Sequence, residues 1–412
     1  MSRPLPGLRS PARISRMDLP ERRDLIGMPL RAAERELEAN SAGKTLVDLT
    51  YANTKRFPPP AWAIEEFTAA ATAGGETYTP YRGHSGVRRT VAGNVSRFLG
   101  TAVDPDRTLM LTPGTQSALF AALAVIVENG DRIALADPDY LTNERILRYF
   151  GANVDHVPVL WEHETEPTLD FDRLESAFRQ NARAFVFSNP NNPTGAVYGA
   201  ATIRRIAELA IKHDVLVVVD ELYSRLVYDG RSILHLCQVE GMAERTVTLL
   251  GPSKTESMSG YRVGVAVAPP AIIDRMEDVQ SVTALRAPAY AQHTLARWLV
   301  DDVALVEERK REYQKLRDYT VTRLRQTGLI EVVPSGGTTY LFPRVVGVDA
   351  SDQEVVLCLQ DKAGVIVNPG YQSGPRGAGH FRVCFAQDLA QYERVLDRIC
   401  EALGSMKQVC AA

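Results

Sequence analysis

The feature of this 412-residue chain that most constrains its fold is an unbroken apolar run at residues 215–219, which ends at Asp220. A run of valine and leucine without polar alternation predicts a strand buried on both faces, as in the interior of a parallel sheet. Further apolar segments alternate with helical stretches on either side of it. Strands are predicted at residues 108–112, 132–136, 154–159, 184–188, 245–250 and 261–267, and helices at residues 116–128, 143–150 and 201–213. This alternation predicts an α/β fold with a mostly parallel central sheet flanked by helices.

The pattern changes after residue 291. A long, charged helix with apolar residues at helical spacing is predicted over residues 294–327, and it would lead into a second domain. Beyond it, the predicted strands lie at residues 331–334, 339–342, 365–367 and 381–385, with helices at residues 352–363 and 391–403. The length of the chain allows two buried cores, so we expect a smaller α+β domain after the large one.

Composition excludes several classes of function. The chain has 47 Lys and Arg against 50 Asp and Glu, and its net charge of −3 gives no reason to expect nucleic acid or an anionic membrane surface. No apolar run reaches the roughly 20 residues that a membrane-spanning helix needs. The five cysteines and seven histidines form no disulfide framework and no metal-ligand pattern, which predicts no metal site and a reduced, cytoplasmic setting. The arginine-rich residues 1–23 are either an organelle transit peptide or a loosely ordered arm, and the lack of a periodic apolar face favours the arm.

Four motifs carry the chemistry. Segment 188–195 is Ser-Asn-Pro-Asn-Asn-Pro-Thr-Gly, and segment 220–223 is Asp-Glu-Leu-Tyr. Lys254 follows an apolar run between small hydroxyl residues, Arg262 comes eight positions later, and Arg382 lies between Phe and Val. In this order and spacing the motifs resemble those of the fold-type-I proteins that bind pyridoxal 5′-phosphate (PLP), specifically the aspartate aminotransferase-like class I/II aminotransferases. The resemblance runs from about residue 47 to about residue 403.

The resemblance implies an enzyme that moves an amino group from an L-amino acid to a 2-oxo acid by a ping-pong mechanism, through a Schiff base between Lys254 and PLP. It also implies a homodimer with shared active sites. The implied division is an N-terminal arm (1–23), a discontinuous small domain (24–60 and 308–412) and a large PLP-binding domain (61–307). Lyases, cyclases, decarboxylases and oxidases use the same scaffold, because PLP stabilises a carbanion whichever bond breaks, so another PLP reaction stays open. A binding protein without activity is disfavoured, since the lysine, the aspartate and the arginine are all present.

Three residues, Lys254, Asp220 and Tyr223, match the catalytic part of the family pattern. Lys254 corresponds to the Schiff-base lysine and proton shuttle, and nearby positive charge and desolvation would favour its neutral amine. Asp220 is expected to hold the protonated pyridine nitrogen, with a strand-end helix cap as the competing interpretation. The resemblance puts Tyr223 and Asn192 at the cofactor's O3′, although Asn-Pro-Thr-Gly is also a good turn by composition alone.

A phosphate site is predicted where residues 114–116 follow a strand and open a helix, because free backbone N–H groups and the helix dipole would face an anion there. Arg262 resembles the family's phosphate-binding arginine, whose planar guanidinium suits two phosphate oxygens. The other cofactor contacts that the resemblance implies are Gly114, Thr115, Gln116, the Ser253 hydroxyl, the Tyr140 ring on the pyridine face, and Tyr78 at the neighbouring subunit's phosphate.

Arg382 is the candidate for the substrate's α-carboxylate. A charged side chain within an apolar strand needs a partner, and a carboxylate can bind it through two hydrogen bonds. An edge-strand arginine facing solvent is the competing interpretation. Ala52 and Asn192 complete the substrate-binding set. Tyr140 also has an alternative, since an aromatic residue at a strand end is usually part of the core.

Three departures from the family pattern bear on the substrate. The loop at residues 51–57 differs from the common Gly-x-Pro-Asp-Phe, Glu256 stands where an aromatic residue is common, and Arg286 replaces a small polar residue. We hypothesise that Arg286 or Arg56 binds a second substrate carboxylate, which would favour a dicarboxylic amino acid such as aspartate. In the alternative interpretation, both arginines are solvated or pair with surface acids. No motif specifies the donor, the acceptor, the pathway or assembly beyond a dimer.

Overall fold

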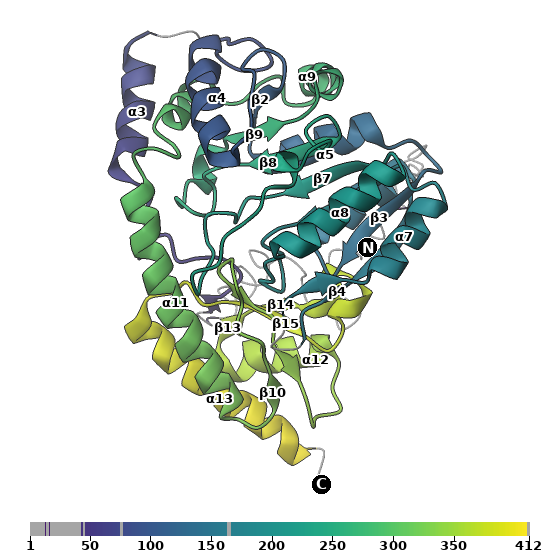
Figure 1. The fold of residues 1–412 in the computed structure, drawn as a ribbon. Helices are drawn as coiled ribbons and strands as arrows, with labels where there is room; N and C mark the ends of the chain where they lie inside the picture. The colour runs from purple at the N-terminus through teal and green to yellow at the C-terminus, as the bar shows by residue number, and fades with distance from the viewer. Residues whose placement is uncertain are drawn as a thin grey trace, which may run out of the picture.

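The computed structural model describes residues 46–74, 77–162 and 166–409, together with Arg13, Arg16 and Gly43. This described part consists of a broad sheet covered by helices and, below it in Figure 1, a smaller group of short strands and helices. The long helix α11 (Val303–Arg325) runs from the first part to the second. The predicted arm at residues 1–23 lies outside the described residues, apart from Arg13 and Arg16.

The broad sheet has eight strands among the described residues. Their spatial order is β2 (Leu109–Thr112), β9 (Gly264–Val267), β8 (Thr246–Leu250), β7 (Leu216–Asp220), β6 (Ala184–Ser188), β3 (Arg132–Asp137), β4 (Asn153–Leu160) and β5 (Thr168–Leu169). Neighbours are parallel from β8 through β4, whereas β9 and β5 are antiparallel to theirs. The predicted α/β fold with a mostly parallel sheet is therefore confirmed.

Helices cover both faces of this sheet. One face carries α7 (Phe171–Arg179) and α8 (Ala200–Lys212), and the other carries α5 (Thr115–Ile126), α6 (Leu141–Phe150) and α9 (Pro270–Thr283). Strand β7 shows how the sequence produces this arrangement. Val217 and Val219 belong to the core on the α8 face, and Val218 belongs to the core on the α5 face. A strand with apolar side chains on both faces is stable only between two helical layers. The helices α3 (Ala61–Thr72) and α4 (Ser85–Leu99) flank the β2 end of the sheet.

The smaller part has several short sheets. These are β1 (Val47–Asp48) parallel to β13 (Val365–Ile366), β10 (Ile330–Glu331) antiparallel to β12 (Arg344–Val345), and the order β11 (Tyr340–Leu341), β15 (Phe381–Cys384) and β14 (Asn368–Pro369). Helices α12 (Asp352–Cys358) and α13 (Leu389–Val409) pack beside them. Leu49 and Phe57 share one core with Tyr392 and Leu396 of α13, so segments far apart in the sequence meet here. The boundaries drawn at residues 23, 60 and 307 remain a prediction.

The single long helix predicted over residues 294–327 is wrong in extent. A short helix α10 (Ala289–Gln292) and a 3₁₀ turn (His293–Ala296) come first, and α11 begins only at Val303. Leu299 adopts a left-handed φ of 70° between them. Asp302 accepts hydrogen bonds from the Leu299 N–H and from Arg225, a residue far away in the sequence. Tertiary contacts to a buried carboxylate thus interrupt a segment whose local pattern is helical.

The predicted strand at residues 261–267 begins later than expected, at Gly264. A 3₁₀ turn (Ser259–Tyr261) and a left-handed Arg262, with φ 53°, take up its first three positions. This turn brings the Arg262 side chain toward the segment that links β2 and α5. Within the described ranges, none of the helices has both the length and the hydropathy of a membrane span.

Candidate active site

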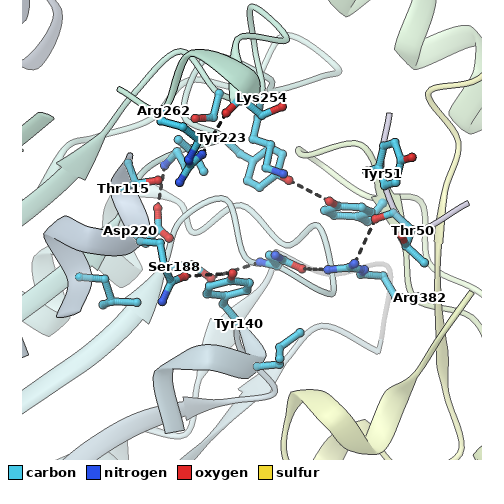
Figure 2. Close-up of a pocket in the computed structure, with 18 residues that line it drawn as sticks. Thr50, Tyr51, Thr115, Tyr140, Ser188, Asp220, Tyr223, Lys254, Arg262 and Arg382 are labelled. Atoms are coloured by element: carbon cyan, nitrogen blue, oxygen red, sulfur yellow. Dashed lines mark hydrogen bonds between the residues drawn. The ribbon is translucent and has the colours of Figure 1, made fainter. Parts of the chain in front are cut away.

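A cavity of about 310 Å³ lies beyond the carboxyl ends of β2, β6, β7 and β8. Open α/β sheets place their ligand sites at this edge, because the loops that follow parallel strands converge there. The smaller part of the chain closes the cavity with Tyr340 and Arg382, and Figure 2 shows the labelled side chains around a common space. The predicted site residues that line it are Thr115, Gln116, Tyr140, Asn192, Asp220, Tyr223, Ser253, Lys254, Arg262 and Arg382.

Asp220 and Lys254 come from adjacent strand ends. Asp220 closes β7 and pairs in register with Leu249 of β8, and Lys254 follows the end of β8. The Oδ1 of Asp220 accepts a hydrogen bond of 3.0 Å from the Leu222 N–H. Desolvation raises the pKa of the Asp220 carboxyl to about 6, although the Leu222 N–H and the charge of Lys254 lower it. A carboxylate this costly to ionise favours a ligand that brings a cationic N–H beside it.

The N-terminus of α5 and the Arg262 guanidinium form a concave site, which we call the anion cradle. Gly114 has a φ of +79°, and a Cβ there would lie 2.5 Å from the Arg262 Nη2. A Cβ on Gly264 would lie 2.6 Å from the Thr115 backbone nitrogen. Arg262 donates to the Ser259 carbonyl at 3.0 Å and pairs with no carboxylate among the described residues. Unpaired helix N–H groups and an unpaired cation together suit a phosphate.

Tyr140 lies beside Gln116, in the first turn of α5. Its hydroxyl donates to the Gln116 Oε1 at 3.1 Å, and its backbone N–H donates to Asp139, which is 2% exposed. Ser188 and Asn191 also donate to the Asp139 carboxylate. Desolvation raises the pKa of Asp139 to about 7, against the effect of these donors. Asp139 was not predicted as a site residue, although it directly precedes Tyr140. Through these hydrogen bonds, the Asp139 carboxylate links the turn before α6 to the segment at the end of β6.

Arg382 is held in place by oxygen atoms that carry no charge. It donates to the Asn192 Oδ1 at 2.9 Å, the Asn368 Oδ1 at 2.8 Å and the Thr50 carbonyl at 3.1 Å. Its guanidinium lies 4.1 Å from the centre of the Tyr340 ring, and its buried Nε has no hydrogen-bond partner. None of the carboxylates in the described ranges pairs with it. A fixed, uncompensated guanidinium at a cavity wall is suited to an anionic group of a ligand.

Tyr223 is buried beside this arginine. Its hydroxyl donates to the Tyr340 hydroxyl at 3.0 Å, and the two rings meet edge to face. Desolvation raises the pKa of Tyr223 well above its ordinary value, so the hydroxyl is neutral at any physiological pH. Sequence reasoning missed Tyr340, Thr50, Tyr51 and Ser188 as lining residues. No local motif marks Tyr340, Thr50 or Tyr51, because the chain brings them to the cavity only by folding. Ser188 opens the motif at residues 188–195, but no role was assigned to it.

Five predicted residues do not line the cavity of this chain: Gly114, Ala52, Arg56, Tyr78 and Arg286. Tyr78 is 79% exposed, and Ala52 packs against the core of the smaller part. Arg286 lies over the Tyr78 ring at 4.9 Å, and its Nε and Nη1 are buried without a hydrogen-bond partner. Arg56 forms an ion pair of 2.8 Å with Glu312, as the surface-pair alternative expects. Glu256 does not line the cavity either, and its side chain is fully buried.

Comparison with known proteins agrees with this geometry. The family pattern of class I and II aminotransferases matches residues 45–399. The chain belongs to the class I and II aminotransferases. It is 32% identical over 349 residues to an aromatic-amino-acid aminotransferase of Thermococcus litoralis, covering 84% of this chain and 89% of that protein. An aspartate aminotransferase of Pyrococcus abyssi is 29% identical over 347 residues, covering 84% and 88%.

A solved structure supports the same assignment. The crystal structure of an aspartate aminotransferase from Rhodobacter sphaeroides superimposes with a TM-score of 0.85 at 38% identity, covering 88% of this chain and 93% of that chain. The predicted family and the predicted enzyme class, an aminotransferase, are therefore confirmed. Enzymes of this family use PLP, so the cavity of this aminotransferase can be tested residue by residue for its fit to that cofactor.

Proposed function

We propose that this aminotransferase binds PLP through Lys254 and transfers the amino group of an L-amino acid to a 2-oxo acid in a ping-pong cycle. When bound, PLP supplies an aldehyde that links to amines and a ring that withdraws electrons from the substrate's Cα. The observation that carries the proposal is the convergence of Lys254, Asp220, the anion cradle and Arg382 on one cavity.

The residues present fit this cofactor. Asp220 would accept the N–H of the ring nitrogen, which would offset the desolvation that raises its pKa. The anion cradle would hold the phosphate, and the absence of a side chain at Gly114 lets the Arg262 guanidinium lie beside the N-terminus of α5. Tyr140 offers a ring face at the cavity wall, and the neutral Tyr223 hydroxyl would donate to the cofactor's O3′ by turning its hydrogen away from Tyr340.

The substrate side of the cavity follows from Arg382. Its unpartnered Nε and its two anchored terminal nitrogens would orient the α-carboxylate of an amino acid. With the carboxylate held there, the Nζ of Lys254 would take the proton from Cα and return it on the cofactor side. Transamination is favoured over another PLP reaction, because the named relatives are aminotransferases.

A donor screen tests the proposal. Purified protein is loaded with PLP, and its absorbance is followed as aspartate, glutamate, alanine, phenylalanine or arginine is added without an acceptor. An aminotransferase converts its cofactor to the amine form with the donor alone, and mass spectrometry then identifies the 2-oxo acid. Borohydride should fix PLP at Lys254 in the wild type and not in Lys254→Ala. A wild type that stays colourless and unmodified at residue 254 would refute the proposal.

We infer further that two copies share their active sites and that Arg286 binds a second substrate carboxylate in the partner's cavity. Two buried guanidinium nitrogens without a partner, beside the exposed Tyr78, support this role. Arg286→Ala should then lower the preference for aspartate over alanine about 10-fold to 100-fold, as expected for loss of a charged hydrogen bond. Arg56→Ala, which breaks only the surface pair with Glu312, is the control. An unchanged ratio of kcat/KM in Arg286→Ala would contradict the inference.

A further inference from the structure

The loop that carries Lys254 is closed and strained. The Met258 N–H donates to the Pro252 carbonyl at 3.2 Å, so the segment between them forms a tight turn after β8. Within it, Ser257 adopts a left-handed φ of 59°, a conformation that costs a non-glycine residue about 1 kcal/mol or more. Such a conformation persists only where its surroundings enforce it. The direction in which Lys254 points therefore depends on what holds this loop from behind.

Glu256 anchors the back of this loop. It stands two positions beyond the lysine, and its side chain is fully buried and does not line the cavity. The Arg225 Nη1 and the Thr255 hydroxyl both donate to its carboxylate. Arg225 stands two positions beyond Tyr223, which lines the cavity. The ion pair therefore ties the segment after β8 to the segment after β7.

The network continues into α11. The Arg225 Nη2 pairs with the Asp302 Oδ1 at 2.7 Å, and the Asp302 side chain is fully buried. Arg309 donates to the Thr255 carbonyl at 2.8 Å and the Ser257 hydroxyl at 3.3 Å. It also donates to the Pro58 carbonyl. The two guanidinium groups and the two carboxylates form one network, which holds the lysine loop on both sides of residue 256.

We propose that Glu256 is a positioning residue for Lys254, which directs the amine toward the cofactor and the substrate Cα by locking the loop onto Arg225. This inference rests on the proposed function, and it assigns a task to a residue that never touches the cavity. An apolar or aromatic side chain at this position could fill the volume, but it would leave the buried Arg225 with one acid fewer. A small displacement of the reacting group is enough to slow catalysis about 100-fold.

The test compares Glu256→Leu and Glu256→Gln with a matched control. Glutamine keeps an oxygen that Arg225 and Thr255 can bind, and leucine does not. The control is Asp229→Asn, which breaks another ion pair to a buried arginine, Arg317, whose side chain is 4% exposed. Asp229 does not line the cavity. All four proteins are prepared without cofactor, and two quantities are measured: the rate at which added PLP is fixed at residue 254, and kcat and KM for the best donor.

In Glu256→Leu we expect PLP capture to slow, and kcat per loaded site to fall about 10-fold to 100-fold with KM unchanged, because Arg382 is untouched. Glu256→Gln should recover most of this loss, and Asp229→Asn should behave as the wild type at temperatures where it is folded. Wild-type capture and kcat in Glu256→Leu would overturn the inference. Equal losses in leucine, glutamine and control variants would also overturn it, because they would indicate a general effect on stability. Failure of the wild type to capture PLP would refute the proposed function itself.

Discussion

Asp220→Asn separates the catalytic use of this carboxylate from its cost to the fold. The asparagine oxygen can still accept the Leu222 N–H bond, so the variant removes charge and little else. We expect the cofactor-free variant to be more stable than the wild type at pH 8, because desolvation makes the carboxylate costly to ionise. We expect catalysis to fall about 100-fold or more, the scale reached when one preorganised charge-stabilising group is lost.

The sign and size of the stability change follow from the pKa. The carboxyl pKa rises from 3.8 to about 6 on folding. Below about pH 4 the carboxyl is protonated in both the folded and the unfolded state. Its burial then does not lower the free energy of unfolding of the wild type. Between about pH 4 and pH 6 the unfolded chain ionises first, and the wild type loses stability as the pH rises. At about 1.36 kcal/mol per pKa unit, the loss in the free energy of unfolding approaches 3 kcal/mol. Water in the open cavity screens the charge and makes the loss smaller.

Urea unfolding of cofactor-free wild type and variant, at pH values from about 4 to about 8, measures this difference. The two curves should converge at the acidic end and separate toward pH 8. Added PLP should reverse the order, because a ring N–H beside the wild-type carboxylate repays its desolvation. Equal stability at pH 8, or a difference that does not change with pH, would refute the argument that Asp220 is held in a costly ionised state.

Two further substitutions test the binding parts of the site. Arg382→Lys keeps the positive charge and loses the planar guanidinium, so KM for amino acids should rise about 10-fold to 100-fold while PLP affinity stays constant. An unchanged KM in steady-state kinetics would show that Arg382 does not bind the substrate carboxylate. Gly114→Ala puts a Cβ where the Arg262 guanidinium lies, so PLP affinity measured by equilibrium dialysis should fall. Gly230→Ala is its control, since that glycine has a φ of +68° and open space around it. Equal weakening in both variants would contradict the anion cradle.

Part of this enzyme could be predicted from local sequence. The apolar runs at β6 and β7 have no polar alternation, which predicts a sheet covered on both faces, and the structure confirms that arrangement. Asp220 closes one of these strands and Lys254 follows the next, so their adjacency follows from parallel pairing alone. Gly114 before α5 marked the anion cradle for a similar local reason: a strand, a glycine and a helix N-terminus are consecutive in the chain.

Other features depend on contacts between distant segments. The role of Glu256 in holding the lysine loop does not follow from its position two residues after the lysine. It depends on Arg225 and Asp302, which come from distant segments of the chain. The contacts of Asp302 with Arg225 and Leu299 also interrupt the predicted helix, so that α11 begins only at Val303. Thr50, Asn192 and Asn368 fix Arg382 across the boundary between the two parts of the chain. Periodicity and motif order determined the fold class and the chemistry of this protein, since both are written in short segments. The direction of each reactive side chain was decided only in three dimensions, where buried charges must find partners wherever the fold supplies them.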